Sequence, residues 1–352
     1  MSGARRPTMA DVAAKAGVSL STVSLTYSGA GPISPDMKAR VEKAAADLGY
    51  AGPSPQARAL RSGRTNVVGL VIHEHLQFAL RDPLTLGVLD GVVGDLGDMG
   101  LGVLLIPSPA TESTEPGLLD TAPMDAAVIM RARDHDEPAL ETLERRGLPV
   151  TIVEGTAPGA ASVTINDTAG TAHLIRHLVE LGHTRIATVT LPRNSQRETA
   201  IVEGDMLAGP LWAPTYHRLQ AFSDVGIEPC VVIETRASFI EEGIAAGHLA
   251  LSHPSRPTAV VCQSDLLAGG VVLAARELGL QVPRDVSITG FDGLDLAWLA
   301  PMELTTMTQD AAAKGHLIAR CVKALLAGEE PPAFELPVEF KRGNSTAVAR
   351  DR

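Results

Sequence analysis

The chain has 352 residues, of which 45% are hydrophobic and 20% charged. This length exceeds what one hydrophobic core usually holds, so we expect two or three domains, and the composition excludes a disordered chain. No secretion signal and no apolar run long enough to span a membrane are found, so we expect a cytoplasmic protein. Three widely spaced cysteines match no metal-binding or redox motif, and we expect them to be buried free thiols: Cys230, Cys262 and Cys321.

The formal net charge of −11 is unevenly distributed along the chain. Residues 1–65 contain nine Lys and Arg against four Asp and Glu, a net charge of +5, which leaves −16 for residues 66–352. A basic N-terminal segment on an acidic body is typical of a phosphate-binding module attached to a soluble sensor domain.

The N-terminal segment has the pattern of a helix-turn-helix. Thr8 and Asp11 form a capping-box-like pair at the start of a first helix, and Gly17 ends that helix. Ser19 is the expected cap of a second helix, and a third is expected over 35–48. Two short helices joined by a glycine-containing turn predict that the second helix enters the major groove of DNA.

The exposed face of that second helix is the candidate DNA-reading surface. Hydroxyl groups can contact bases or phosphates, and leucine can contact thymine methyl groups, although Ser21 and Ser24 can equally be solvated helix residues. The expected DNA-contacting residues of the head are Thr8, Ser19, Leu20, Ser21, Thr22, Ser24, Leu25 and Ser28.

A linker follows over residues 52–65. By itself it is an ordinary connection, but next to a DNA-binding head it has a second interpretation. Leu60, flanked by Arg58 and Arg61, has the pattern of a minor-groove wedge with two phosphate contacts.

From residue 66 onward, short apolar runs alternate with amphipathic helices. Strands are expected at 67–72, 103–106, 126–130, 150–153, 186–190, 231–233, 259–262 and 287–290. This alternation predicts doubly wound parallel sheets in two tandem lobes, a clamshell like that of the periplasmic binding proteins. In such sheets ligands bind beyond the carboxyl ends of the strands.

Several runs resemble the LacI/GalR family of regulators. In the first 65 residues these are MADVAAKAGVSLSTVSLTYSG, PISPDMKARVEKAAADLGY and ARALRSGRT. In the body they are HLVELGHTRIATV, RPTAVVCQSDLLAGG, LGLQVPRDVSITGFD and LTTMTQDAAAKG. The resemblance implies a homodimer that reads a pseudo-palindromic operator in double-stranded DNA, with hinge segments that become helical and insert Leu60 at the central base step.

The resemblance also implies a domain plan. It comprises a helix-turn-helix head over 1–51, a hinge over 52–65 and an effector-binding and dimerisation domain over 66–352. Because the chain crosses between lobes three times, we expect an N-lobe of about 66–163 and 309–329, and a C-lobe of about 164–308 and 330–352.

Four features depart from the family pattern. Leu25 occupies a position usually held by a base-reading arginine, and Pro55 adds one residue to the hinge. Residues 82–85 replace a segment that usually ends in two aromatics, and the loop over 194–214 is longer than usual. The operator sequence and the effector class therefore cannot be inherited from the family.

Motif matching nonetheless gives effector-contact candidates. Asp292, Arg218, Ser264 and Glu154 stand at family positions, and a buried Asp and Arg could hold hydroxyls or a carboxylate. The alternatives are that Asp292 caps a turn and that Arg218 forms a surface ion pair. The effector set is completed by Asp82 and Phe78, whose ring is equally explained by core packing.

Other functional classes have less support. His73 with His75, or His173 with His177, could bind a metal, but no third ligand is apparent and we expect none. No nucleophile elbow, P-loop or dinucleotide-binding motif is present, so we expect no enzyme activity and no cofactor. A solute-binding protein would share the clamshell but would not need the helix-turn-helix. The sequence thus predicts a transcriptional repressor controlled by a small molecule, for example a sugar or another small polar metabolite. Whether the ligand induces or corepresses is left open.

Overall fold

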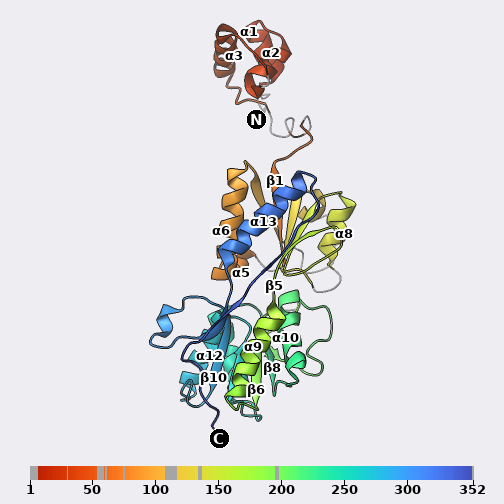
Figure 1. Cartoon of the computed structure of the whole chain (residues 1–352). Coiled ribbons are helices and arrows are strands. Elements are labelled where there is room, and N and C mark those ends of the chain that lie inside the picture. Colours follow the sequence, from red (N-terminus) through yellow and green to blue (C-terminus); the bar gives the residue numbers. More distant parts are fainter. Residues whose placement is uncertain are drawn as a thin grey trace. The chain divides into compact units, whose positions relative to one another are not determined.

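The computed structural model describes residues 7–29, 31–53, 59, 62–73, 76–107, 117–133, 137–194 and 198–350. The chain forms two compact units that divide between Thr65 and Asn66 (Figure 1). In the described ranges, no helix is long and apolar enough to cross a membrane.

The N-terminal unit is a three-helix head, with α1 (Met9–Ala16), α2 (Leu20–Ser28) and α3 (Pro35–Leu48). The expected capping box is confirmed: the Thr8 backbone N–H donates to Asp11 over 2.8 Å, and the Thr8 hydroxyl accepts from the Asp11 backbone. Gly17, at φ 64°, ends α1 in the left-handed region that favours glycine. Val12, Val23 and Val41 are fully buried, so one side chain from each helix fills the core.

The second unit contains two lobes, each built on one sheet. The first lobe has a six-stranded parallel sheet in the order β12-β5-β4-β3-β1-β2. Its strands are β1 (Val67–Ile72), β2 (Gly102–Pro107), β3 (Ala126–Met130), β4 (Val150–Val153), β5 (Ala161–Ile165) and β12 (Ala333–Leu336). Its helices are α5 (Leu76–Ala79), α6 (Pro83–Asp98), α7 (Leu118–Thr121), α8 (Pro138–Arg145) and α13 (Ala311–Leu326). Helices α6 and α13 share one apolar cluster with the sheet, and α7 and α8 share another, so both faces are covered.

The second lobe has a seven-stranded sheet in the order β13-β11-β10-β9-β6-β8-β7, antiparallel only at its two edges. Its strands are β6 (Ile186–Thr190), β7 (Ala200–Ile201), β8 (Val232–Glu234), β9 (Ala259–Cys262), β10 (Ser287–Asp292), β11 (Thr305–Thr308) and β13 (Glu339–Lys341). Its helices are α9 (Asp167–Glu180), α10 (Ala213–Val225), α11 (Ile240–Leu251) and α12 (Asp265–Glu277). Helices α11 and α12 pack on one face, and α9 and α10 pack on the other.

The chain passes between the lobes three times, and Figure 1 shows the segments that connect them. The first passage follows β5, the second follows β11, and the third lies at 337–338 between β12 and β13. The structure differs here from the expected lobe boundaries, which assigned residues from 164 and from 330 to the C-lobe. Strand β5 extends to Ile165, and β12 pairs with β5 in the first sheet, since its backbone completes that sheet edge.

Candidate effector cavity and DNA-binding head

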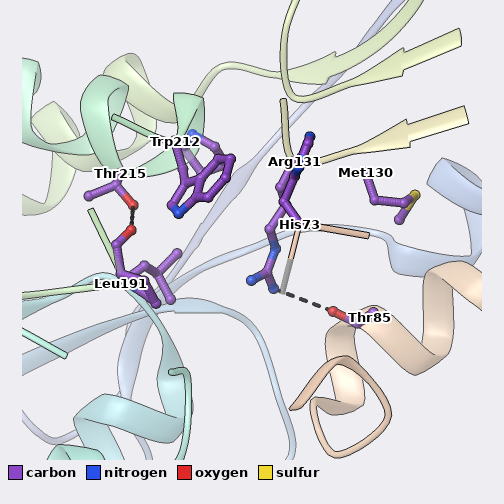
Figure 2. A pocket seen from close by; sticks show the side chains of 9 residues that line it. His73, Thr85, Met130, Arg131, Leu191, Trp212 and Thr215 are labelled. Atoms are coloured by element: carbon purple, nitrogen blue, oxygen red, sulfur yellow. Dashed lines mark hydrogen bonds between the residues drawn. The ribbon is translucent and has the colours of Figure 1, made fainter. Parts of the chain in front are cut away.

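A cavity lies between the two lobes of the body (Figure 2). It is lined by His73, Thr85, Met130 and Arg131 from the first lobe, and by Leu191, Pro192, Trp212, Pro214 and Thr215 from the second. Three of these residues directly follow a strand: His73 follows β1, Arg131 follows β3 and Leu191 follows β6. The cavity therefore occupies the position where parallel sheets bind ligands, at the carboxyl ends of their strands.

Arg131 is fixed in the wall of this cavity by Asp82. Its Nη2 donates to Oδ2 of Asp82 over 2.8 Å and contacts the hydroxyl of Thr85 at 3.3 Å. Asp82 is itself positioned because its side chain caps the N-terminus of α6 and accepts a hydrogen bond from the Thr85 hydroxyl over 3.0 Å. Asp82, an expected effector residue, thus orients the guanidinium of Arg131. Arg131 was not among the residues predicted from the sequence.

Trp212 forms the opposite wall, and its indole faces Arg131 across the cavity in Figure 2. It stacks on the His73 imidazole with ring centroids 5.0 Å apart. Only 7% of Trp212 is exposed, and among the described residues its Nε1–H has no hydrogen-bond partner. A buried indole donor without an acceptor is costly, and a ligand that supplied an acceptor would remove that cost.

Glu137 supports this wall from behind, since its Oε2 lies 3.1 Å from Nε2 of His73. Burial alone would raise the pKa of Glu137, but the hydrogen bond and charge of His73, together with backbone N–H donors, hold that pKa below its ordinary value. The carboxylate therefore stays ionised and fixes the imidazole under the indole.

Three of the expected effector residues belong to a buried network at the junction of the lobes. Lys314 on α13 forms an ion pair with Glu154 and donates to the Gln309 side-chain carbonyl over 2.6 Å. Gln309 in turn donates to Oδ1 of Asp292 over 2.7 Å, and Nη1 of Arg218 lies 4.0 Å from the same oxygen. The network thus connects Glu154 of the first lobe to Arg218 and Asp292 of the second.

Arg218 is held more tightly by other groups than by Asp292. Its Nε donates to Asp167 over 2.7 Å, its Nη1 donates to the Gln263 carbonyl, and its Cζ lies 3.7 Å above the Phe291 ring. This arrangement does not support the alternative that Arg218 is a surface ion-pair residue. Burial raises the pKa of Asp292 well above its ordinary value, although the nearby Arg218 guanidinium acts in the opposite direction.

The two remaining effector candidates make contacts elsewhere. Ser264 caps α12 and accepts a hydrogen bond from the Ser238 hydroxyl over 2.8 Å. Phe78 packs edge-on against Phe239 of the second lobe, with centroids 5.3 Å apart, so it contacts the other lobe. None of the six expected effector residues is among the described residues that line the cavity, and their direct contact with a ligand stays a prediction.

The head places its candidate DNA-contacting residues on α2 and at the two helix starts. Thr8 caps α1, and Ser19 caps α2 by accepting from the Thr22 backbone over 3.1 Å. Leu20 is 51% exposed, and Ser21 and Ser28 are exposed, whereas Thr22, Ser24 and Leu25 are partly buried. The expected hinge contacts Arg58, Leu60 and Arg61, and the additional Pro55, lie outside the described residues.

The other sequence motifs have structural explanations. His183 is buried and hydrogen-bonded to Thr258, Ser287 and the Ala347 carbonyl, while His173 and His177 both pack against Phe340. Over the described ranges, no group of three potential ligands could hold a metal ion. The three cysteines are free; Cys262 and Cys321 are buried and Cys230 is partly buried.

A three-helix head with an exposed second helix, joined to a two-lobed body with a cavity between the lobes, defines a ligand-responsive DNA-binding regulator. The chain matches the family of bacterial regulatory proteins, lacI family, over residues 8–53 and the periplasmic binding protein-like domain over residues 175–346. It is 32% identical to an HTH-type transcriptional regulator of Mycobacterium tuberculosis, over 95% of this chain and 93% of that protein.

Two further comparisons agree. The HTH-type transcriptional regulator IpsA of Corynebacterium glutamicum is 30% identical, over 97% of each chain. The solved structure of a CelR–cellobiose complex is 25% identical with a TM-score of 0.64, over 97% of this chain and 100% of that one. The chain therefore belongs to the lacI family of bacterial regulatory proteins. It is a DNA-binding transcriptional regulator, and its family consists of regulators rather than enzymes.

Proposed function

We propose that this regulator is a homodimeric repressor whose effector binds in the cavity between the lobes and changes its affinity for operator DNA. The observation that carries this proposal is that both lobes contribute to the lining, with Arg131 from one and Trp212 from the other. A ligand touching both lobes interacts differently with open and closed arrangements, so it shifts their populations. Because operator DNA is in the bacterial cytoplasm, we propose that the protein acts there.

On the DNA side, we propose that α2 reads the major groove through Leu20, Ser21, Ser24 and Leu25. The exposure of Leu20 supports this assignment, because an exposed leucine at the start of a helix suits contact with a thymine methyl group. Leu60 is proposed from the sequence as the minor-groove wedge of the hinge.

In vitro selection of duplex DNA by the full-length protein tests the proposal. A pseudo-palindrome of about one to two helical turns is expected, because the two heads of a dimer read two half-sites. Leu25→Ala should alter base preference within a half-site, whereas Lys38→Ala, at an exposed position of α3, should not. The proposal would be contradicted if no motif were recovered, either with the protein alone or with cell metabolites present.

Effector coupling needs a second measurement on the selected site. Operator affinity is measured while metabolites are added, and an effector should change it by about 5- to 150-fold. The substitution Trp212→Ala should abolish that change, judged against the variant's own operator affinity without ligand, because it removes one wall of the cavity. If the effector still changed the operator affinity of this variant by the original factor, the assignment of the cavity as the effector site would be contradicted.

A further inference from the structure

We propose that the effector of this regulator is a small monocarboxylate with an apolar body. The inference rests on the proposed function of the cavity and specifies the class of ligand that the cavity accepts. It uses the lining chemistry on both lobes, where Arg131 and Trp212 face each other (Figure 2).

The first argument is the direction of the hydrogen bonds that the cavity offers. Arg131 can only donate, and so can the indole of Trp212, whose Nε1–H has no acceptor in the described part of the chain. The Thr85 hydroxyl already donates to Asp82, and the Thr215 hydroxyl donates to the Pro192 carbonyl over 2.8 Å. The strongest polar groups of the lining are therefore hydrogen-bond donors, and their complement is a ligand with acceptor oxygens.

The second argument is the absence of acceptors suited to a polyol. Of the described residues that line the cavity, none carries a carboxylate or a carboxamide. A sugar brings many hydroxyl donors, and each donor buried without an acceptor costs free energy. A carboxylate brings acceptors only, and a guanidinium is the cation that matches its geometry.

The third argument is the remainder of the lining. Met130, Leu191, Pro192 and Pro214 present apolar surface, and the flat indole of Trp212 adds to it. Such surface stabilises a hydrocarbon chain or ring and offers nothing to hydroxyl groups. Because Asp82 holds Arg131 in the wall of the cavity, the charged end of the ligand is directed to that wall.

Calorimetric titration of the full-length protein tests the proposal. The probes are benzoate, phenylacetate and hexanoate, with benzamide as an uncharged analogue and glucose and cellobiose as polyols. At least one carboxylate should bind at millimolar concentration or tighter, and at least tenfold more tightly than benzamide and both polyols. Tighter binding of a polyol, or no binding of any carboxylate, would overturn the proposal.

Variants distinguish a specific charge contact from a structural effect. Arg131→Gln should weaken the best carboxylate at least tenfold and leave benzamide binding unchanged, because benzamide lacks the charge. Trp212→Phe should weaken both compounds, since both accept from the indole. The matched control Arg145→Gln removes one exposed arginine at the end of α8 and should change neither. Equal loss of both probes in Arg131→Gln would contradict the assignment.

Operator binding separates this inference from the proposed function. A carboxylate that binds through Arg131 but leaves operator affinity unchanged would support the ligand class and contradict the coupling. A polyol that changes operator affinity through the cavity would support the coupling and contradict the ligand class.

Discussion

Arg218 donates from Nε to Oδ1 of Asp167 over 2.7 Å, and both side chains are almost fully buried. The pair joins α10 to the first residue of α9, immediately after the chain passes from the first lobe to the second. Burial raises the pKa of Asp167, and the charge and hydrogen bond of Arg218 oppose that shift. The carboxylate therefore depends on its partner to stay ionised.

The substitution Arg218→Met should lower the free energy of unfolding by about 3–5 kcal/mol, because it leaves buried carboxyl groups without their cation. Urea denaturation of the full chain measures this loss. The double variant Arg218→Met/Asp167→Leu should recover part of it, since it removes the unpaired charge as well. A double variant less stable than the single one would contradict this account.

The pH dependence of stability should include a contribution from His183. Burial lowers the pKa of its imidazole in the folded state, so at mildly acidic pH the unfolded chain binds a proton that the folded chain does not. Stability should therefore fall as the pH drops below the ordinary histidine pKa of about 6.5. The variant His183→Gln should show a shallower fall between pH 7 and pH 5 in denaturation experiments. An unchanged slope would mean that His183 is not responsible.

The contribution of the N-terminal cap of α2 to the stability of the head should be measurable. Ser19→Ala removes the acceptor of the Thr22 backbone N–H and should cost about 1 kcal/mol of helix stability. Hydrogen exchange of the Thr22 amide should become faster. Ser19→Asn keeps a side-chain acceptor at the cap position, provides the control and should change stability by less than about 0.5 kcal/mol. Equal effects of the two substitutions would rule out the capping role.

A contact between the lobes combines an ion pair with an aromatic pair. Arg81 lies 2.5 Å from Glu241 of the second lobe, and its Cζ lies 3.9 Å above the Phe239 ring. Because the ion pair is exposed and screened by solvent, Glu241→Gln should change stability by less than about 1 kcal/mol. Phe239→Ala should cost more, about 3 kcal/mol, since this ring is buried between the lobes. Thermal unfolding of both variants checks the ranking, and a reversed order would contradict it.

The regular elements could be predicted closely from the sequence. Strands at 126–130, 150–153, 186–190 and 259–262 were predicted with the bounds that the structure has, because buried parallel strands are continuous apolar runs with sharp ends. Strands β5, β7, β11, β12 and β13 were not predicted. Strands β5 and β11 contain Ser or Thr and are not continuous apolar runs, and β7 has only two residues. Strands β12 and β13 alternate exposed and half-buried residues and lie at sheet edges. The positions of β12 and β13 depend on pairing with β5 and β11, respectively. Such long-range pairing cannot be predicted from the local sequence pattern.

The cavity was predictable in part. His73, Arg131 and Leu191 each directly follow a predicted strand, so their positions agree with the rule that ligands bind at the carboxyl ends of parallel strands. Motif matching instead selected residues such as Arg218 and Asp292, which lie in the buried junction. Trp212 was not predictable, because it follows no predicted strand and its contact with His73 joins residues far apart in sequence; it is the N-cap residue of α10.

The three passages between the lobes are very short. One residue, Asn166, separates β5 from α9, two residues separate β11 from α13, and two separate β12 from β13. Each passage acts as a mechanical pivot with almost no slack, because a chain of one or two residues cannot lengthen appreciably. Sliding one lobe past the other would have to stretch all three at once, whereas rotation needs only changes in their backbone torsion angles. The motion available for transmitting a signal is therefore a swing of one rigid lobe about the other, with an axis fixed by these three pivots.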